Sequence, residues 1–174
     1  MLLQILAHTP KWVFALFAVL LSLGAKQLLA GRVGLARITI LPLAMSALSF
    51  WGVISAFGDS PLALLGWAAA AGTLGAFVLA RPLPASTRYE PSTRSFLVAG
   101  SAVPLVLMMG IFFTKYVVGV LLVMHPRMAH QGEFTIAIGT LYGAFSGTFA
   151  ARSLRLWKLA LRADGQRLGA AIPE

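Results

Sequence analysis

The sequence predicts an all-α fold, a polytopic membrane helical bundle with five transmembrane helices. Of its 174 residues, 59% are hydrophobic and only 11% are charged, and the mean hydropathy is +0.85. Soluble domains average about 45–50% apolar and about 25% charged residues. So few charges could not cover a water-facing surface, and the apolar residues fall into long runs. We therefore expect residues 1–174 to form a single membrane domain covered by lipid.

Five apolar segments come close to the length of a membrane span. A helix needs about 20 apolar residues to cross a hydrocarbon core roughly 30 Å thick. The brief turn at 58–60 would make the second and third spans antiparallel neighbours, and the proline-containing stretch 81–95 is expected to be an extended loop. Beyond the last span, residues 152–164 would form a basic juxtamembrane helix at the cytoplasmic surface. The expected spans cover residues 12–30, 39–58, 61–80, 96–124 and 134–151.

The distribution of lysine and arginine predicts the orientation. Positively charged loops stay in the cytoplasm. Only two basic residues, Lys11 and Arg127, lie in the segments before the first span, between the second and third spans, and between the fourth and fifth spans. The N-terminus should therefore lie outside and the C-terminus in the cytoplasm, as in a multi-pass protein of the bacterial inner (cytoplasmic) membrane. Eleven basic residues lie in alternate loops and the tail, namely Lys26, Arg32, Arg37, Arg81, Arg88, Arg94, Arg152, Arg155, Lys158, Arg162 and Arg167.

The same distribution bears on partners. The net charge of +9 could suggest nucleic acid, but the charges fall between apolar runs, which is typical of cytoplasmic loops. We expect no nucleic-acid partner. The bilayer itself, and anionic lipid at the basic tail, are the expected partners.

Small residues at intervals of four predict close helix contacts. Lipid supplies no hydrophobic force between helices, so close backbone approach has to help hold a bundle together. The contact is either internal or between copies of the protein, which would make a homo-oligomer. The fifth span carries Gly139, Gly143 and Gly147, and the third carries Ala68, Gly72 and Ala76.

Lys115 is the one formally charged residue deep within an apolar run. Ionisable groups in membrane spans are costly and are functional candidates. The run 96–124 is longer than a span requires, so two depths are open. Lys115 either reaches the outer interface or lies near the midplane and needs a partner. Tyr116 and Tyr142 are the candidate polar neighbours.

A second set of candidates gathers on the predicted outer face. Imidazole with thioether suits copper, and imidazole with carboxylate suits zinc or divalent iron. Two interpretations of these residues stay open: they are solvated side chains at the rim of the membrane, or they are ligands of a divalent metal. No cofactor is otherwise predicted. The candidate ligands are His8, Asp59, His125, His130 and Glu133, and the thioethers of Met124 and Met128 lie alongside.

Three stretches resemble a known family when taken in order. They are the opening fourteen residues, Leu41–Phe50 in the second span and Leu141–Gly147 in the fifth. Together they resemble an uncharacterised family, a domain of unknown function, of small proteobacterial inner-membrane proteins. The resemblance implies an inner-membrane location and no activity. It makes four residues part of a family pattern without stating their roles, namely His8, Lys11, Tyr142 and Gly143.

The sequence shows no recognisable catalytic set. It has no cysteine, no histidine or carboxylate inside a predicted span, and no phosphate-binding GxxxxGK[ST] loop. The prediction is a non-enzymatic membrane protein acting in transport, permeation or assembly of a membrane complex. One alternative is a membrane enzyme or metal-handling protein with its site at the periplasmic rim. Another is a lipid- or isoprenoid-binding protein that uses a cavity between the long fourth helix and its neighbours.

Overall fold

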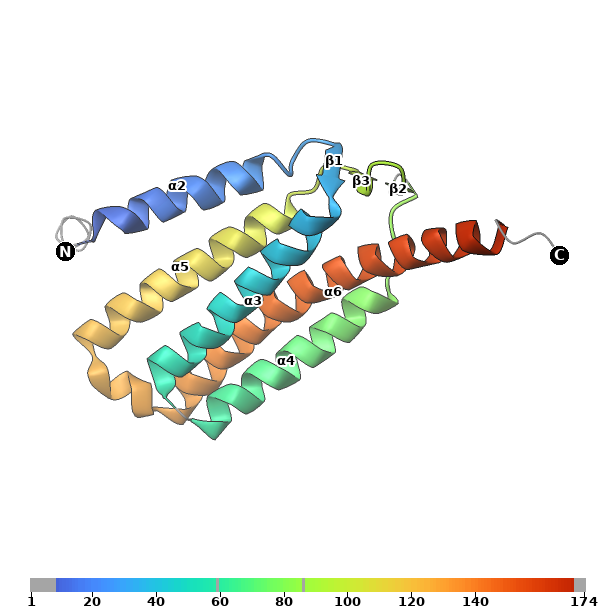
Figure 1. Ribbon diagram of the computed structural model, residues 1–174. Coiled ribbons are helices and arrows are strands. Elements are labelled where there is room, and N and C mark those ends of the chain that lie inside the picture. Colours follow the sequence, from blue (N-terminus) through green and yellow to red (C-terminus); the bar gives the residue numbers. More distant parts are fainter. Residues whose placement is uncertain (1–8, 59, 86, 171–174) are drawn as a thin grey trace.

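The computed structural model describes residues 9–58, 60–85 and 87–170, with side chains to residue 166. In these ranges the chain forms five α-helices, one 3₁₀ helix and three short strands (Figure 1). The helices are α2 (Lys11–Ala25), α3 (Leu35–Phe57), α4 (Pro61–Ala80), α5 (Val103–Met124), η1 (Pro126–His130) and α6 (Gly132–Ala170). The strands are β1 (Gly31–Gly34), β2 (Arg88–Glu90) and β3 (Ser95–Val98).

Four of the described helices, α3, α4, α5 and α6, are long and apolar enough to cross a membrane. The segment expected as the first span is apolar but shorter, because its helix α2 ends at Ala25 after 15 residues. The next residues turn, with the amide of Gln27 donating to Gly24 O at 3.0 Å, and the chain enters β1. Within the described residues, four of the five segments expected to span therefore form helices of spanning length.

The prediction of one helix from residue 96 to 124 is wrong at its beginning. Residues 95–98 form the central strand of an antiparallel sheet in the order β1-β3-β2, and α5 starts only at Val103. Phe96 pairs with Val33 on one side and with Tyr89 on the other, and its side chain is fully buried. Pairing with segments distant in sequence outweighs the helical reading of this apolar run. The loop expected at 81–95 correspondingly contains β2.

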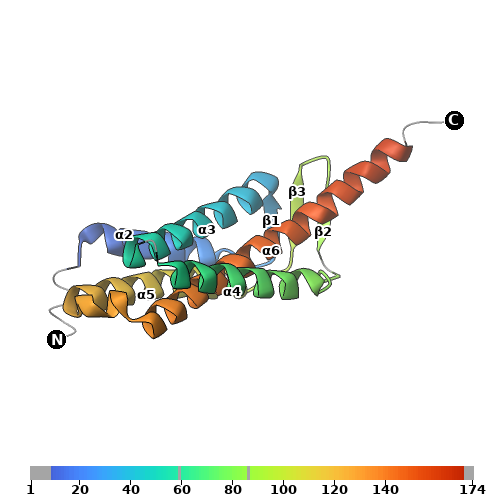
Figure 2. The same ribbon diagram turned by 90° about the horizontal axis from the view of Figure 1, so that it is seen from below.

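Residues 152–164 do not form a separate helix. They continue α6 without a break to Ala170, so that this 39-residue helix extends past the sheet (Figures 1 and 2). At 1.5 Å per residue its length is about 58 Å. The distal half packs Trp157 and Ala160 against the sheet and the start of α3. The indole N–H of Trp157 donates to Thr39 Oγ1 at 3.0 Å.

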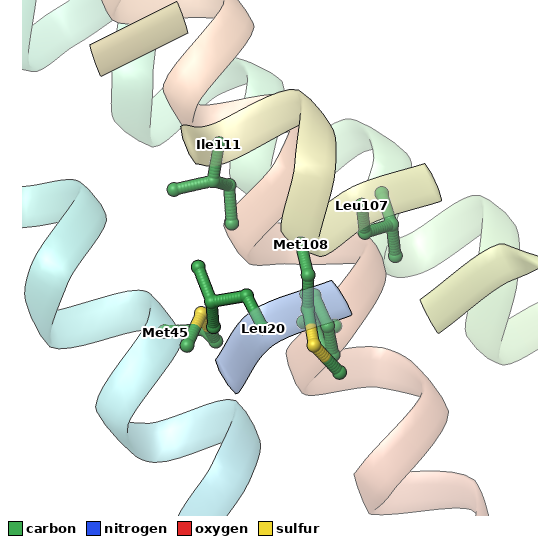
Figure 3. Packing of buried hydrophobic residues seen from close by; sticks show 6 residues of the cluster. Leu20, Met45, Leu107, Met108 and Ile111 are labelled. Carbon is green, nitrogen blue, oxygen red and sulfur yellow. The ribbon is translucent and has the colours of Figure 1, made fainter. Parts of the chain in front are cut away.

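Helix α6 is the central packing partner in the bundle: it packs most extensively against α4 and next against α3. Although a short turn joins α3 to α4, α4 packs mainly against α6 rather than against α3. Helix α2 packs along α5, on the side of the bundle opposite α4 (Figure 1). The core where α2, α3 and α5 meet is built from Leu20, Met45 and Met108 with their neighbours (Figure 3).

Candidate functional site

A cavity of about 550 Å³ lies between α2, α3 and α5. Its walls are nearly all apolar, with Leu16 from α2, Leu48 from α3 and Phe112 from α5 among them. Helices α2 and α5 approach closely at Gly24, where an added Cβ would lie 3.0 Å from Leu105 Cα. At Gly119, in the cavity wall, an added Cβ would meet nothing within 4 Å. The missing side chain of Gly119 thus leaves space that the neighbouring helices do not fill.

Lys115 is the only charged side chain among the described residues that line this cavity. Its Nζ lies 3.6 Å from the point that a Cβ on Gly52 would occupy, and the hydroxyl of Tyr142 lies at the same distance from that point. Gly52 therefore makes room for both polar groups. No ion pair joins Lys115 to a carboxylate within the part of the chain that the structure describes.

The wall of the cavity carries further polar groups. Tyr116, one residue after Lys115, pairs its hydroxyl with Thr9 Oγ1 at 2.7 Å. This hydrogen bond joins α5 to the residues before α2 and places both oxygens in the cavity wall. The structure thus brings Lys115 and Tyr142 together around Gly52 and sets Tyr116 in the same wall as Lys115.

Tyr142 belongs to a buried network that joins three helices. Its side chain is 1% exposed, and its backbone carbonyl accepts a hydrogen bond from Ser49 Oγ at 3.0 Å. Ser49, on α3, also accepts from the indole N–H of Trp67 on α4 at 3.3 Å. Buried polar groups that are satisfied in this way hold helices in one arrangement. These two hydrogen bonds connect α3 with α6 and α4 with α3.

The glycines of α6 lie where α6 meets α4. A Cβ on Gly139, Gly143 or Gly147 would overlap the backbone carbonyl of Ala63, Trp67 or Ala71, respectively. The glycine ladder therefore contacts α4 of its own chain. The other small residues that were predicted to make a close helix contact lie on the exposed side of α4, namely Ala68, Gly72 and Ala76. Small residues line two faces of α4. The face that contacts α6 consists of Ala63, Trp67 and Ala71, and the sequence pattern did not reveal it because its middle residue is a tryptophan.

The predicted metal ligands are not gathered in the described part of the chain. His125 directly follows α5, His130 ends η1 and Glu133 lies in the first turn of α6, and all three side chains are exposed. Among the residues that the structure describes, no three histidine, aspartate or glutamate side chains form a metal-binding group. His8 and Asp59 lie outside the described residues.

Sequence reasoning missed most of the cavity wall. Only Lys115 and Tyr116 were singled out, because charge and hydroxyl groups are conspicuous in an apolar run. The sequence signal for the rest of the cavity wall was Gly119. It follows Lys115 by four residues and therefore lies on the same face of the helix. One glycine in an apolar helix has many explanations, and only the position of α2 shows that this one borders a cavity.

Comparison with known proteins identifies the family of this chain. The family described as "Family of unknown function (DUF6622)" matches residues 1–166. No curated protein and no solved structure matches the chain.

Proposed function

Because the chain belongs to the family DUF6622, to which no function is attached, we propose a function from the geometry: an integral membrane protein that binds an amphipathic anion. The apolar tail of this ligand occupies the cavity and its acidic headgroup pairs with Lys115. The observation that carries the proposal is a cavity of about 550 Å³ with one charged side chain, Lys115, and no acidic one among its described lining residues. Small-molecule sites have volumes of roughly 300–1,000 Å³.

The proposal includes the orientation inferred from the loop charges. The loops that carry Lys26, Arg32 and Arg88 meet at the sheet end of the bundle, and the turn before α4 and η1 lie at the other end (Figure 1). In this arrangement the sheet faces the cytoplasm, and the membrane is the bacterial inner membrane. This is the placement that the excess of positive charge favours.

The bounds of α5 support a deep position for Lys115. It lies twelve residues after Val103 and nine before Met124, or about 18 Å and about 13 Å from the two ends. A helix of 22 residues is about 33 Å long, which matches a hydrocarbon core of about 30 Å. Lys115 is then near the midplane, where a lone ammonium group is costly and an anionic ligand offsets that cost.

The ligand's headgroup, rather than its tail, determines selectivity. An apolar chain leaves lipid for an equally apolar cavity, so burial contributes little free energy. The ion pair forms in a medium of low dielectric constant and is worth more than in water. A charged hydrogen bond contributes about 1.5–3 kcal/mol, which is roughly a ten- to hundredfold preference over a neutral analogue. Binding of this kind suits transport or permeation better than catalysis, since no nucleophile–base pair accompanies Lys115 in the described cavity wall.

A photoreactive fatty acid, with a diazirine in its chain, tests the proposal. Purified protein in an uncharged detergent is labelled with the acid or with the matching alcohol, and the labelled peptides are identified by mass spectrometry. The acid should label segments of α2, α3 and α5, and Lys115→Met should reduce this labelling at least tenfold. Lys158→Met, which removes an exposed lysine from α6, is the matched control and should leave the labelling unchanged.

Two results would contradict the proposal. Equal labelling by the acid and the alcohol would show that no cation selects the headgroup. Acid labelling that survives in Lys115→Met, or that maps evenly over all the helices, would place the ligand outside this cavity. Lys115→Arg serves as a further check, because it keeps the charge and should retain most of the labelling.

A further inference from the structure

A second, smaller hollow lies at the sheet end of the bundle, between the starts of α3 and α5 and the middle of α6. Its volume is about 90 Å³, several times the roughly 10–15 Å³ that one water requires. Two arginines line it, Arg37 from α3 and Arg152 from α6. Gln27 and Ser153 add polar groups, and none of the described lining residues is acidic.

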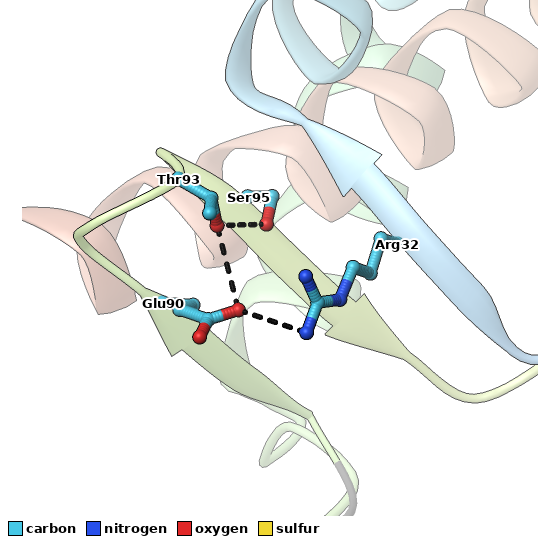
Figure 4. Close-up of polar contacts among 4 residues, drawn as sticks. All are labelled: Arg32, Glu90, Thr93 and Ser95. Atoms are coloured by element: carbon cyan, nitrogen blue, oxygen red, sulfur yellow. Dashed lines mark hydrogen bonds and ion pairs between the residues drawn. The ribbon is translucent and has the colours of Figure 1, made fainter.

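Both arginines lack a carboxylate partner within the described residues. The terminal NH2 nitrogen of Arg37 is buried and makes no hydrogen bond, although buried polar groups are normally satisfied. Arg152 donates to Ser101 Oγ at 3.4 Å, a long contact with a neutral group. The nearby acid of the sheet, Glu90, is already paired with the exposed Arg32 at 3.3 Å, as Figure 4 shows.

Three further features make this hollow electropositive. Arg155 follows Arg152 by one turn on α6, outside the lining of the hollow, and its terminal NH2 nitrogen donates to the carbonyl oxygen of Pro82. Its positive charge adds to that of Arg152, because side chains three residues apart lie on one face of a helix. Helices α3 and α5 both begin beside the hollow, and neither has an acidic residue in its first turn. The N-terminal end of a helix carries a partial positive charge. An anion in the hollow would therefore be attracted by two guanidinium groups and two helix ends together.

We propose that this hollow binds a phosphate group through Arg37 and Arg152. A guanidinium presents its N–H groups as a planar fork that matches two phosphate oxygens, so the unpartnered nitrogen of Arg37 would gain an acceptor. The volume of about 90 Å³ admits one phosphate group, and the rest of any molecule that carries this phosphate would lie outside the hollow. The same chemistry is offered by a lipid phosphate headgroup at the membrane surface and by free inorganic phosphate in the cytoplasm.

Thermal unfolding of the full chain in dodecyl maltoside separates these sources. The probes are inorganic phosphate, short-chain phosphatidic acid and short-chain phosphatidylcholine, each compared with sodium chloride at equal ionic strength. A saturating ligand should raise the Tm of the wild-type protein by about 5–10 °C. A rise with inorganic phosphate identifies a free-anion site, and a rise with phosphatidic acid alone identifies a headgroup site.

The variants Arg37→Gln and Arg152→Gln should lose this rise, and Arg162→Gln should keep it. Arg162 is exposed on the same helix, so its variant removes the same charge away from the hollow. Without ligand, Arg152→Gln should be at least as stable as the wild type, because it removes an unpaired charge. Arg152→Lys keeps the charge without the fork and should show a smaller rise.

The proposal is overturned if none of the probes shifts the wild-type Tm relative to sodium chloride. It is equally overturned if phosphate or phosphatidic acid raises the Tm of the two pocket variants as much as that of Arg162→Gln. A rise with phosphatidylcholine equal to that with phosphatidic acid would show general lipid stabilisation and would also overturn it. The first of these outcomes depends on the wild-type protein alone, so it decides the question even where a variant does not fold.

Discussion

Replacing Gly143 with alanine adds one methyl group where α6 touches the backbone of α4. The new Cβ would overlap the carbonyl oxygen of Trp67 and lie within 2.8 Å of its Cα. These are backbone atoms, which cannot move aside by a change of rotamer, so the two helices have to separate. Gly72→Ala makes the same chemical change at an exposed site on α4 where nothing lies within 4 Å.

The magnitude follows from comparing the two variants. Alanine favours a helix over glycine by about 1 kcal/mol, and this gain is common to both sites and cancels in their difference. What is left is the cost of overpacking at Gly143, about 1–3 kcal/mol. Gly72→Ala should therefore be as stable as the wild type or slightly more stable, and Gly143→Ala clearly less stable than Gly72→Ala.

Unfolding in detergent, followed by far-ultraviolet circular dichroism during heating, measures this order. Gly143→Leu should likewise be less stable than Ala150→Leu, and the difference in Tm should be larger, because leucine adds more volume at the contact. Equal Tm values for Gly143→Ala and Gly72→Ala would refute the reasoning, since they would mean that α6 does not touch α4 at this glycine.

Three other predictions concern the cavity, the buried network and the orientation. Gly119→Leu should fill the cavity and abolish labelling by the photoreactive fatty acid at nearly unchanged stability, and Gly72→Leu should leave the labelling intact; full labelling of Gly119→Leu would place the ligand elsewhere. Ser49→Ala should lower the free energy of unfolding by about 1–3 kcal/mol, because the tryptophan N–H of α4 loses its acceptor in the interior, and an unchanged Tm would show that this network is dispensable. Alkaline phosphatase fused after Asp59 should be active and after Glu174 inactive, and the reverse pattern would overturn the orientation.

The sequence by itself determined where most helices lie. Apolar runs of spanning length are a local property, so α3 and α4 were predicted within a few residues. The glycine ladder of α6 also identified a contact face in advance, because only small side chains let helix backbones touch. Lys115 stood out for the same local reason, as a single charge within an apolar run.

Only the tertiary structure decided how these pieces meet. Residues 95–98 became a strand because β1, some sixty residues earlier, and β2 supply hydrogen-bonding partners on both sides. The rotation of α4 about its axis selected Ala63, Trp67 and Ala71 for the contact with α6, although small residues line another of its faces too. The cavity that Lys115 lines, and the hollow that Arg37 and Arg152 line together, are each formed by segments far apart in the chain. Hydropathy along a sequence carries no information about such distances, because they are determined by side chains on several helices packing at once.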